Sequence, residues 1–169
     1  MNPARELRRL YALAFGATAL LSVGLGLVAN HLIVNCTRSL PLGLYWISRG
    51  TGPGRGDLVA VPVPASVRTL VRERRYLPEG ALLLKRVVAW PGDRVCTEGG
   101  VFSINDAPFG ALESHDSAGR SLPQLTFCGM VADGELYLAS RAPHSFDSRV
   151  FGPVFATDVR GTVTPVWTF

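Results

Sequence analysis

The sequence predicts a mainly antiparallel β domain that follows one N-terminal membrane-spanning helix. Two observations carry this prediction. Residues 11–34 form a single long apolar stretch, and its first part, from Tyr11 to Ala29, contains no charged residue. Beyond residue 40 the chain consists of short apolar runs separated by turns rich in proline and glycine, with no long amphipathic helical pattern. The 169 residues are enough for one domain of ordinary size.

The N-terminal stretch has the layout of a membrane anchor. About 20 helical residues with a rise of about 1.5 Å each span the roughly 30 Å hydrocarbon core of a bilayer. A basic cluster precedes the apolar stretch, and the positive-inside rule places such a cluster in the cytoplasm. We therefore expect a cytoplasmic N-terminus over residues 1–10, a transmembrane anchor over residues 11–34 and an extracytoplasmic domain over residues 35–169.

A cleavable secretory signal is the main alternative for this stretch. It shares the basic start, but its apolar core usually covers only about 7–15 residues. No convincing Ala-x-Ala cleavage site follows here, because the chain continues through Asn30, His31 and Asn35. A retained anchor therefore fits better. The length of the apolar stretch also argues against a buried helix of a soluble protein.

Five apolar runs beyond the anchor are the expected strands. Turn signals such as GPGRGD, LPEG, PGD and ADGE separate them. One further segment, Ala65–Arg75, carries charges at nearly helical spacing, and we expect a short helix or an excursion from the sheet there. The expected strands are Leu58–Val63, Ala81–Trp90, Arg94–Ile104, Glu135–Ala139 and Gly161–Phe169.

The charge distribution argues against a nucleic-acid partner. The formal net charge is +4, and part of this excess belongs to the basic cluster before the anchor. The remaining basic residues form no run interleaved with aromatic side chains, which is the usual mark of a nucleic-acid-binding surface. We therefore expect no nucleic-acid partner.

The three cysteines show neither the spacing nor the nearby histidines of a zinc site. Their odd number allows at most one internal disulfide. In a domain outside the cytosol, Cys96–Cys128 is the expected pair, because Cys36 lies at the membrane boundary. Three unpaired, buried thiols are the alternative, and the sequence leaves both open.

The lysine content singles out one residue. Of the 17 basic residues only Lys85 is a lysine, and it lies in the apolar segment ALLLKRVVAWPGD. Unlike arginine, a buried lysine can lose its proton near neutral pH, because burial disfavours the ammonium form. The neutral amine can then serve as general base for a serine hydroxyl. The simpler alternative is a strand-edge lysine whose ammonium group reaches water.

Three segments resemble the type I signal peptidases, the S26 serine–lysine peptidases. The segment LLLKRVVAWPGDRV resembles their K-R-x-x-x-x-P-G-D block, and SFDSRVFGPV, residues 145–154, resembles their S-x-D-S-R-x-x-G block. TRSLPLGLYW, residues 37–46, places a serine directly after the anchor. Three motifs in the family's order are far more specific than any one of them. The resemblance implies a signal-peptidase-like antiparallel β catalytic domain that needs no metal or organic cofactor.

The serine segment favours one branch of this family. General secretory enzymes carry S-M-x-P, whereas residues 39–45 of this chain read SLPLGLY. This S-x-P-x-G-x-Y pattern is similar to the conjugative-transfer signal peptidases of the TraF type, which mature pilin subunits. The stretch Ala139-Ser140-Arg141 also departs from the G-D-N run that often precedes S-x-D-S-R.

The resemblance implies a catalytic dyad of Ser39 as nucleophile and Lys85 as general base. Ser145 matches the serine that hydrogen-bonds the base lysine and orients it. Thr37 matches a hydroxyl that helps the backbone N–H of Ser39 to hold the oxyanion. The alternative for Thr37 is a hydroxyl that only satisfies local backbone groups.

The residues around the third motif have supporting roles in this interpretation. Asp147 and Arg149 are expected to form an ion pair or turn behind the base. His144 invites a Ser-His-Asp triad with Asp147, which we do not favour because residues so close along the chain rarely build one. His115 lies in the polar segment ESHDSAGR and is expected to be solvated.

The expected protein is a single-pass endopeptidase of the bacterial inner membrane with its catalytic domain in the periplasm. Its partners would be membrane lipid and a precursor with a signal peptide, or a pilin precursor, cleaved after a small residue. Either water or the substrate's own amine could resolve the acyl-enzyme, and the second route would give a cyclised pilin. The alternatives are a general secretory signal peptidase and a non-catalytic, membrane-tethered assembly protein of the same fold.

Overall fold

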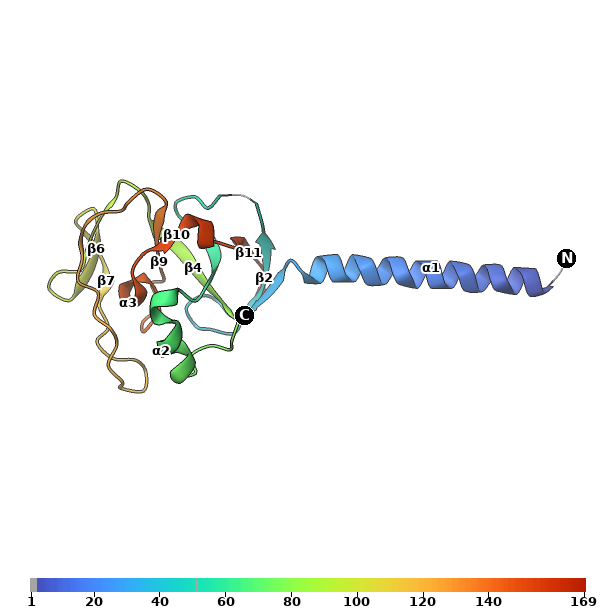
Figure 1. Cartoon of the computed structure of the whole chain (residues 1–169), viewed down its shortest axis with the longest axis horizontal. Coiled ribbons are helices and arrows are strands. Elements are labelled where there is room, and N and C mark those ends of the chain that lie inside the picture. The colour runs from blue at the N-terminus through green and yellow to red at the C-terminus, as the bar shows by residue number, and fades with distance from the viewer. Residues whose placement is uncertain (1–2, 51) are drawn as a thin grey trace. The chain divides into compact units, whose positions relative to one another are not determined.

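The computed structural model describes residues 3–50 and 52–169, and the chain divides into two compact units, Met1–Leu32 and Ile33–Phe169. The first unit is the helix α1 (Pro3–Ala29), drawn in blue in Figure 1. Its part Leu10–Ala29 has a mean hydropathy of 2.0 and is long and apolar enough to cross a membrane. Large apolar side chains such as Phe15 and Leu20 are exposed, at 78% and 76%. Water would be a costly surrounding for them, and lipid a favourable one.

The helix ends earlier than the expected anchor boundary at residue 34. Its last turn closes with the N–H of Asn30 on the carbonyl of Gly26 and that of His31 on Val28. The apolar residues that follow form strand β1 (Leu32–Asn35). The reason is local, because Leu-Ile-Val-Asn contains two β-branched residues and enters a sheet beside the next strand.

The second unit consists of two sheets, and the strand pairs described in them run antiparallel. The larger sheet has the order β1-β2-β11-β3-β4-β9-β10 and the smaller one the order β7-β6-β5-β8. Figure 1 shows β6 and β7 at one end of this unit, and β2 and β11 at the other. The larger sheet adds to β1 the strands β2 (Gly43–Ser48), β3 (Leu58–Pro62), β4 (Leu82–Ala89), β9 (Glu135–Ala139), β10 (Val154–Phe155) and β11 (Gly161–Thr168).

One predicted strand, which lies in the smaller sheet, was wrong. The run Arg94–Ile104 is not one strand but a hairpin of β5 (Arg94–Cys96) and β6 (Val101–Ile104). Gly99 and Gly100 lie between them with φ of 60° and 77°, values that glycine adopts without steric cost. The sheet is completed by β7 (Ala107–Ala111) and β8 (Cys128–Met130).

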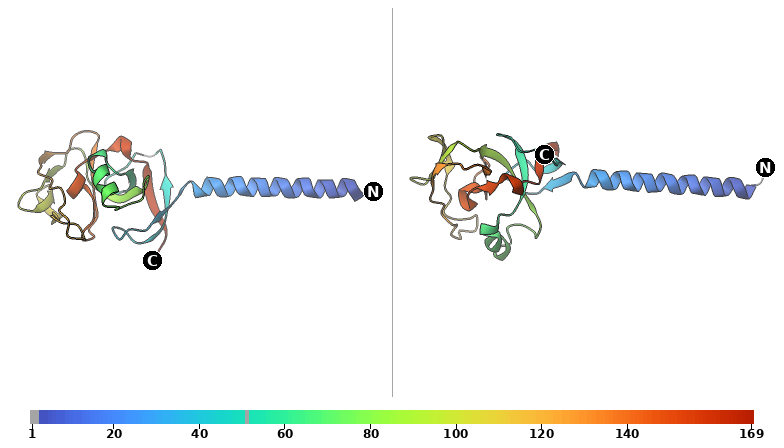
Figure 2. Two further views of the ribbon diagram at one scale, coloured as in Figure 1. Left: turned by 60° about the horizontal axis from the view of Figure 1, so that its bottom comes forward. Right: turned by 45° about the horizontal axis from the view of Figure 1, so that its top comes forward.

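The other expected elements are present. The strands expected at Leu58–Val63, Ala81–Trp90, Glu135–Ala139 and Gly161–Phe169 correspond to β3, β4, β9 and β11. Segment Ala65–Arg75 folds as a 3-10 turn, η1 (Ala65–Val67), followed by α2 (Arg68–Glu73). The green helix α2 lies in front of the middle of the unit in the left view of Figure 2 and at its lower edge in the right view. A second 3-10 turn, η2 (Ala156–Asp158), links β10 to β11.

The strands that bear the core lie in the middle of the larger sheet. Val59, Val61, Val87 and Leu138 from β3, β4 and β9 are at most 1% exposed and belong to one apolar cluster. The short helix α3 (Ser148–Phe151) packs Phe151 onto the same cluster. The centre of β4 therefore lies in an apolar environment, and Lys85 is at this centre.

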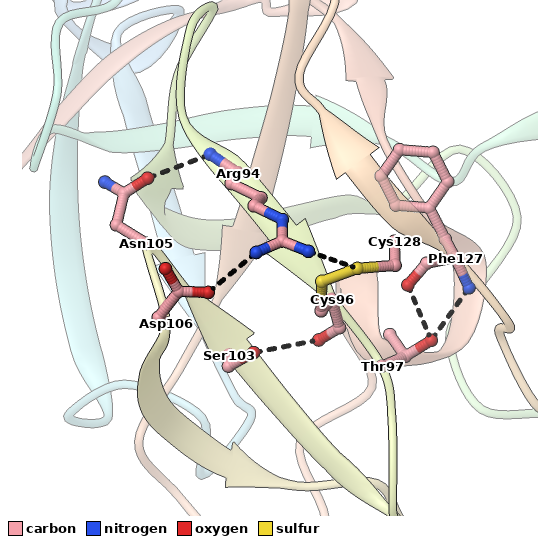
Figure 3. Close-up of a disulfide and its surroundings, with 8 residues drawn as sticks. All are labelled: Arg94, Cys96, Thr97, Ser103, Asn105, Asp106, Phe127 and Cys128. Carbon is pink, nitrogen blue, oxygen red and sulfur yellow. Dashed lines mark hydrogen bonds and ion pairs between the residues drawn. A yellow bond between two sulfur atoms is a disulfide. The ribbon is translucent and has the colours of Figure 1, made fainter.

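A disulfide joins Cys96 to Cys128, the expected pair. The two cysteines are directly opposite each other on β5 and β8, with their Cα atoms 4.0 Å apart. Figure 3 shows the bridge between Arg94 and Thr97, whose hydroxyl lies 3.1 Å from the carbonyl oxygen of Phe127. Cys36 is a free, exposed cysteine. The bridge closes a loop that contains β6, β7 and the segment up to β8.

Candidate active site

The turn that bears Ser39 is organised by one buried amide side chain. Asn35, at the end of β1, is 5% exposed. Its Nδ2 donates to the carbonyls of Thr37, Leu40 and Pro41 at 3.0, 3.2 and 3.0 Å. Its Oδ1 accepts from the backbone N–H and the hydroxyl of Thr37 at 3.1 and 2.8 Å. One side chain thus fixes both ends of the turn around Ser39.

The glycine and the tyrosine of the S-x-P-x-G-x-Y pattern each have a structural role. The hydroxyl of Tyr45, a residue only 1% exposed, donates to the carbonyl of Pro41 at 2.8 Å. Gly43 has φ of 144°, and a Cβ there would collide with the backbone carbonyl of Trp167 on β11. Only glycine therefore allows β2 to pass this close to β11 directly after the turn.

Lys85 lies in the middle of β4 and is only 3% exposed. Its neighbours across the sheet include Val59 on β3. Burial lowers the pKa of Lys85 to about 8, since the ammonium form loses its hydration; Asp147 opposes this shift and Arg149 adds to it. A sizeable share of the amines is then neutral near pH 7 to 8, so Lys85 is suited to accept a proton.

Ser145 is buried, at 7% exposure. Its Oγ has no hydrogen-bond partner among the residues that the structure describes. A buried hydroxyl left in this way costs about 1–3 kcal/mol. Ser145 lines the same cavity as Lys85. Since an unpaired buried hydroxyl destabilises the fold, its position beside Lys85 indicates a role in the site.

One cavity of about 350 Å³ brings four of the six expected site residues together. We call it the serine–lysine cavity. Thr37 and Ser39 reach it from the turn after β1, Lys85 from β4 and Ser145 from the loop before α3. The hydroxyl oxygens of Thr37 and Ser39 are 3.3 Å apart. Other residues that line it are Tyr76, Leu77, Leu83, Glu113, His144 and Phe146.

The hydroxyl of Thr37 is engaged locally. It donates to Asn35 Oδ1 at 2.8 Å, so its oxygen is left to accept the proton of Ser39. This geometry favours the local alternative over the oxyanion role, because an oxyanion needs a donor and the single proton of Thr37 points elsewhere. Thr37 thereby orients the Ser39 hydroxyl.

Asp147 and Arg149 form an ion pair behind the cavity rather than within it. Asp147 is fully buried and accepts from Arg149 Nε at 2.9 Å and Nη2 at 2.8 Å. It also caps α3 by accepting from the backbone N–H of Arg149 at 3.1 Å. The hydrogen bonds that Arg149 donates to Asp147 raise the pKa of Arg149. Neither residue lines the serine–lysine cavity, which fits the supporting role expected for them.

The ion pair is linked to Ser39 through Ser140, which sequence reasoning missed. Asp147 accepts from the backbone N–H of Ser140 at 3.2 Å, and Arg149 donates to its carbonyl at 3.1 Å. The hydroxyl of Ser140 then donates to the carbonyl of Ser39 at 2.5 Å, across 101 residues of sequence. The only signal in the sequence was the departure from G-D-N at this position.

The histidines take no part in a triad with Asp147. His144 Nδ1 lies 3.4 Å from Glu113 Oε2, and its side chain is 59% exposed. Asp147 is occupied by Arg149. His144 nevertheless lines the serine–lysine cavity, as does His115. The expectation that His115 is solvated agrees with its exposure.

The residues described do not offer a metal site near these groups. Within residues 3–50 and 52–169, the one group of three metal-type ligands is Cys96, Glu98 and Cys128. Its two sulfurs are joined in the disulfide, so they are not free thiolates and this set does not fit a metal ion.

These features agree with the comparisons to known proteins. The family model described as signal peptidase, peptidase S26, matches residues 5–168. The chain therefore belongs to the S26 signal peptidase family, as its three motifs indicated.

Two of the similar proteins are named as plasmid or conjugal transfer proteins. The chain is 33% identical to the "Plasmid transfer protein TraF" of Escherichia coli, over 94% of this chain and 95% of that protein. It is 36% identical to the "Conjugal transfer protein TraF" of Agrobacterium fabrum, over 86% of each. Among solved structures, a signal peptidase I from Enterococcus faecalis V583 matches at 26% identity with a TM-score of 0.41, covering 69% of this chain and 100% of that one.

Proposed function

We propose that this protein is a membrane-anchored serine endopeptidase that matures a conjugative pilin precursor with a Ser39–Lys85 dyad. The observation that carries the proposal is the serine–lysine cavity, which Ser39 borders together with a buried lysine whose pKa is lowered to about 8. The similarity to TraF proteins over nearly the whole chain supports the conjugative substrate.

We infer the chemistry from the residues that line the cavity. The hydroxyl of Ser39 turns from Thr37 and gives its proton to neutral Lys85, while its oxygen attacks the carbonyl carbon of a small residue of the precursor. The ammonium then gives its proton to the leaving amine, and an acyl-enzyme remains on Ser39. Ser145 lines the same cavity as Lys85, and its hydroxyl has no other hydrogen-bond partner among the described residues, so we infer that it orients the amine of Lys85 during the reaction. Asp147 and Arg149 hold the backbone of Ser140, and the hydroxyl of Ser140 holds that of Ser39.

The acyl-enzyme has two acceptors in this scheme. Water would release a linear product, and the amine of the pilin's own N-terminus would release a cyclised product. Mass spectrometry distinguishes them, because the cyclised product is lighter than the hydrolysed one by one water molecule. This measurement decides the outcome of the second step without altering the dyad.

The dyad is tested by cleavage assays with the full-length protein in detergent. We expect Ser39→Ala and Lys85→Arg to abolish cleavage of a pilin precursor while thermal unfolding stays cooperative. Ser103→Ala and Arg72→Lys are matched controls, since both residues lie outside the serine–lysine cavity, and they should keep full activity. Full activity in either dyad variant would contradict the mechanism.

The same assay separates the alternatives. A general secretory signal peptidase would process an ordinary secretory precursor as readily as the pilin precursor. A non-catalytic assembly protein would cleave neither and would still bind the pilin precursor.

The proposal places the N-terminus in the cytoplasm, α1 in the inner membrane and Ile33–Phe169 in the periplasm. Support comes from the apolar span Leu10–Ala29 and the basic residues that precede it. Protease added to intact spheroplasts should degrade the C-terminal domain. Protection until the membrane is opened would contradict this orientation.

A further inference from the structure

A second cavity, of about 540 Å³, borders Ser39 on the other side of β4. Successive residues of a strand point to opposite faces. Leu83 and Lys85 line the serine–lysine cavity, whereas Arg86 and Val88 line the second one. Arg38 and Ser39 border both cavities. A polypeptide whose carbonyl lies at Ser39 therefore has space on two sides of the scissile bond.

The second cavity is distinguished by its charge. Three arginines line it, from three separate segments: Arg38 in the nucleophile turn, Arg86 on β4 and Arg141 in the loop after β9. No aspartate or glutamate is among its lining residues. We call it the arginine cavity.

These three arginines differ from others in the domain in having no carboxylate partner. Five arginines of the described chain form ion pairs with an aspartate: Arg55, Arg74, Arg94, Arg120 and Arg149. By contrast, Arg86 donates to the carbonyl of Gly56 at 2.5 Å, and Arg141 lies over the ring of Phe109 at 5.1 Å. In the chain as described, no ion pair involves the arginines of this cavity.

The remaining walls are partly apolar, because Leu42, Val88 and Phe109 line the same cavity. Arg38, Arg86 and Arg141 are themselves exposed, so their attraction for an anion is partly screened by salt. A planar guanidinium group recognises a carboxylate through paired N–H donors. The cavity is therefore chemically matched to a carboxylate.

We propose that the arginine cavity binds a carboxylate of the substrate polypeptide within a few residues of the scissile bond. The inference rests on the proposed function, because Ser39 brings the substrate there. An extended chain advances about 3.3 Å per residue, so an acidic side chain close to the bond, or a nearby C-terminal carboxylate, reaches a cavity that begins at Ser39. A peptide is favoured over an anionic lipid because the cavity shares Arg38 and Ser39 with the site of attack.

Binding to the Ser39→Ala protein tests this inference without requiring cleavage. The probes are ten-residue peptides of alanine, glycine and serine with one glutamate at successive positions, and the same peptides with glutamine. Each is made with a free and with an amidated C-terminus. Affinity and the NMR signals of the arginine Nε–H groups are followed during titration into the full-length protein in detergent.

We expect a glutamate peptide to bind about tenfold more tightly than its glutamine counterpart, the effect of one charge-assisted contact. The signals of Arg86 and Arg141 should shift with it. The double variant Arg86→Gln and Arg141→Gln should lose this preference but still bind the glutamine peptide as before, which shows that the fold is intact. The matched control Arg72→Gln should keep the preference.

The two carboxylate sources are separated by the amidated peptides. Tighter binding of the glutamate than of the glutamine peptides when both are amidated assigns the site to an acidic side chain. Tighter binding of the free than of the amidated glutamine peptide assigns it to the C-terminus, and either result supports the inference. Equal affinity of all peptides would overturn it, as would arginine signals that respond only to nanodiscs of anionic phospholipid. Failure of the wild type to cleave any precursor would contradict the proposed function alone, because the binding readout uses no cleavage.

Discussion

The two halves of the proposed dyad lie in opposite surroundings. Ser39 belongs to a partly exposed turn whose geometry is fixed by hydrogen bonds from Asn35, Tyr45 and Ser140. Lys85 lies in a core strand, 3% exposed, and no hydrogen bond fixes its amine in the described part of the chain. Position is thus controlled on the serine side by polar contacts, and reactivity on the lysine side by burial.

This difference separates stability from activity. Polar contacts to a turn are individually worth about 0.5–1.5 kcal/mol, so their loss misplaces the serine without unfolding the domain. A buried amine destabilises the fold in its charged form. Substitution of Lys85 should therefore raise stability and abolish activity, whereas substitutions around Ser39 should lower both.

The largest effect is expected at the ion pair behind both halves. Asp147→Ala leaves the buried guanidinium of Arg149, 8% exposed, without its carboxylate. We expect a loss of about 3–5 kcal/mol in the free energy of unfolding, measured by chemical denaturation. Asp106→Asn is the control, since its pair with Arg94 is exposed and should contribute less than about 1 kcal/mol; asparagine also tolerates the φ of 64° at this position. Equal losses in both variants would show that burial does not determine the effect.

Substitution of Lys85, the proposed base, should stabilise the protein and abolish its activity. Lys85→Met removes an amine that burial destabilises, and we expect a gain of about 1–3 kcal/mol at pH 7. The pKa of Lys85 is lower in the folded state, so the unfolded chain binds more protons between about pH 8 and 10.5. Wild-type stability therefore rises with pH across that window, and the gain from Lys85→Met shrinks. A variant that is less stable than the wild type at pH 7 would contradict the assignment of burial as the cause.

On the serine side, Asn35→Ala should lower both the stability of the domain and kcat. The turn loses the amide that bonds to Thr37, Leu40 and Pro41, and we expect a loss of about 1–3 kcal/mol in stability with a kcat reduction of about 10²-fold. Asn105→Gly removes an amide bonded to Asp93 far from Ser39. It should cost stability without a selective loss of kcat, and a comparable loss of kcat there would refute the positioning role of Asn35.

The smallest effect is expected at Ser140. Ser140→Ala removes the hydroxyl that donates to the carbonyl of Ser39 and accepts from the N–H of Ala142, whereas the bonds to Asp147 and Arg149 use the backbone of Ser140 and remain. One such bond corresponds to about a three- to tenfold fall in kcat with KM nearly unchanged. Ser103→Ala, which removes another hydroxyl near a backbone carbonyl, should leave kcat unchanged. A change in KM alone would assign Ser140 to substrate binding instead.

The sequence was sufficient where a pattern is local. The apolar helix, the strands bounded by glycine and proline, and the unusual single lysine were all visible without coordinates. The position of Lys85 on β4 followed from the apolar residues on both sides of it. The hairpin of β5 and β6 was missed because apolar residues flank a Glu-Gly-Gly turn, so the two strands resembled one run.

The sequence was insufficient where residues far apart meet. Ser140 contacts Ser39 across 101 residues, and no periodicity marks such a pair. Asn35 had been treated only as a residue after the anchor, because its role depends on how the turn folds back. The arginine cavity was equally invisible, since its charges come from three separate segments.

The most direct test of the dyad is the pH dependence of kcat/KM for precursor cleavage by the wild type. The base must be neutral to act, and burial lowers the pKa of Lys85 to about 8. We predict that kcat/KM rises with pH and levels off above an apparent pKa near 8. A profile that is flat between about pH 7 and 9, or one governed by a group near pH 6.5 that disappears in His144→Gln, would contradict Lys85 as the general base.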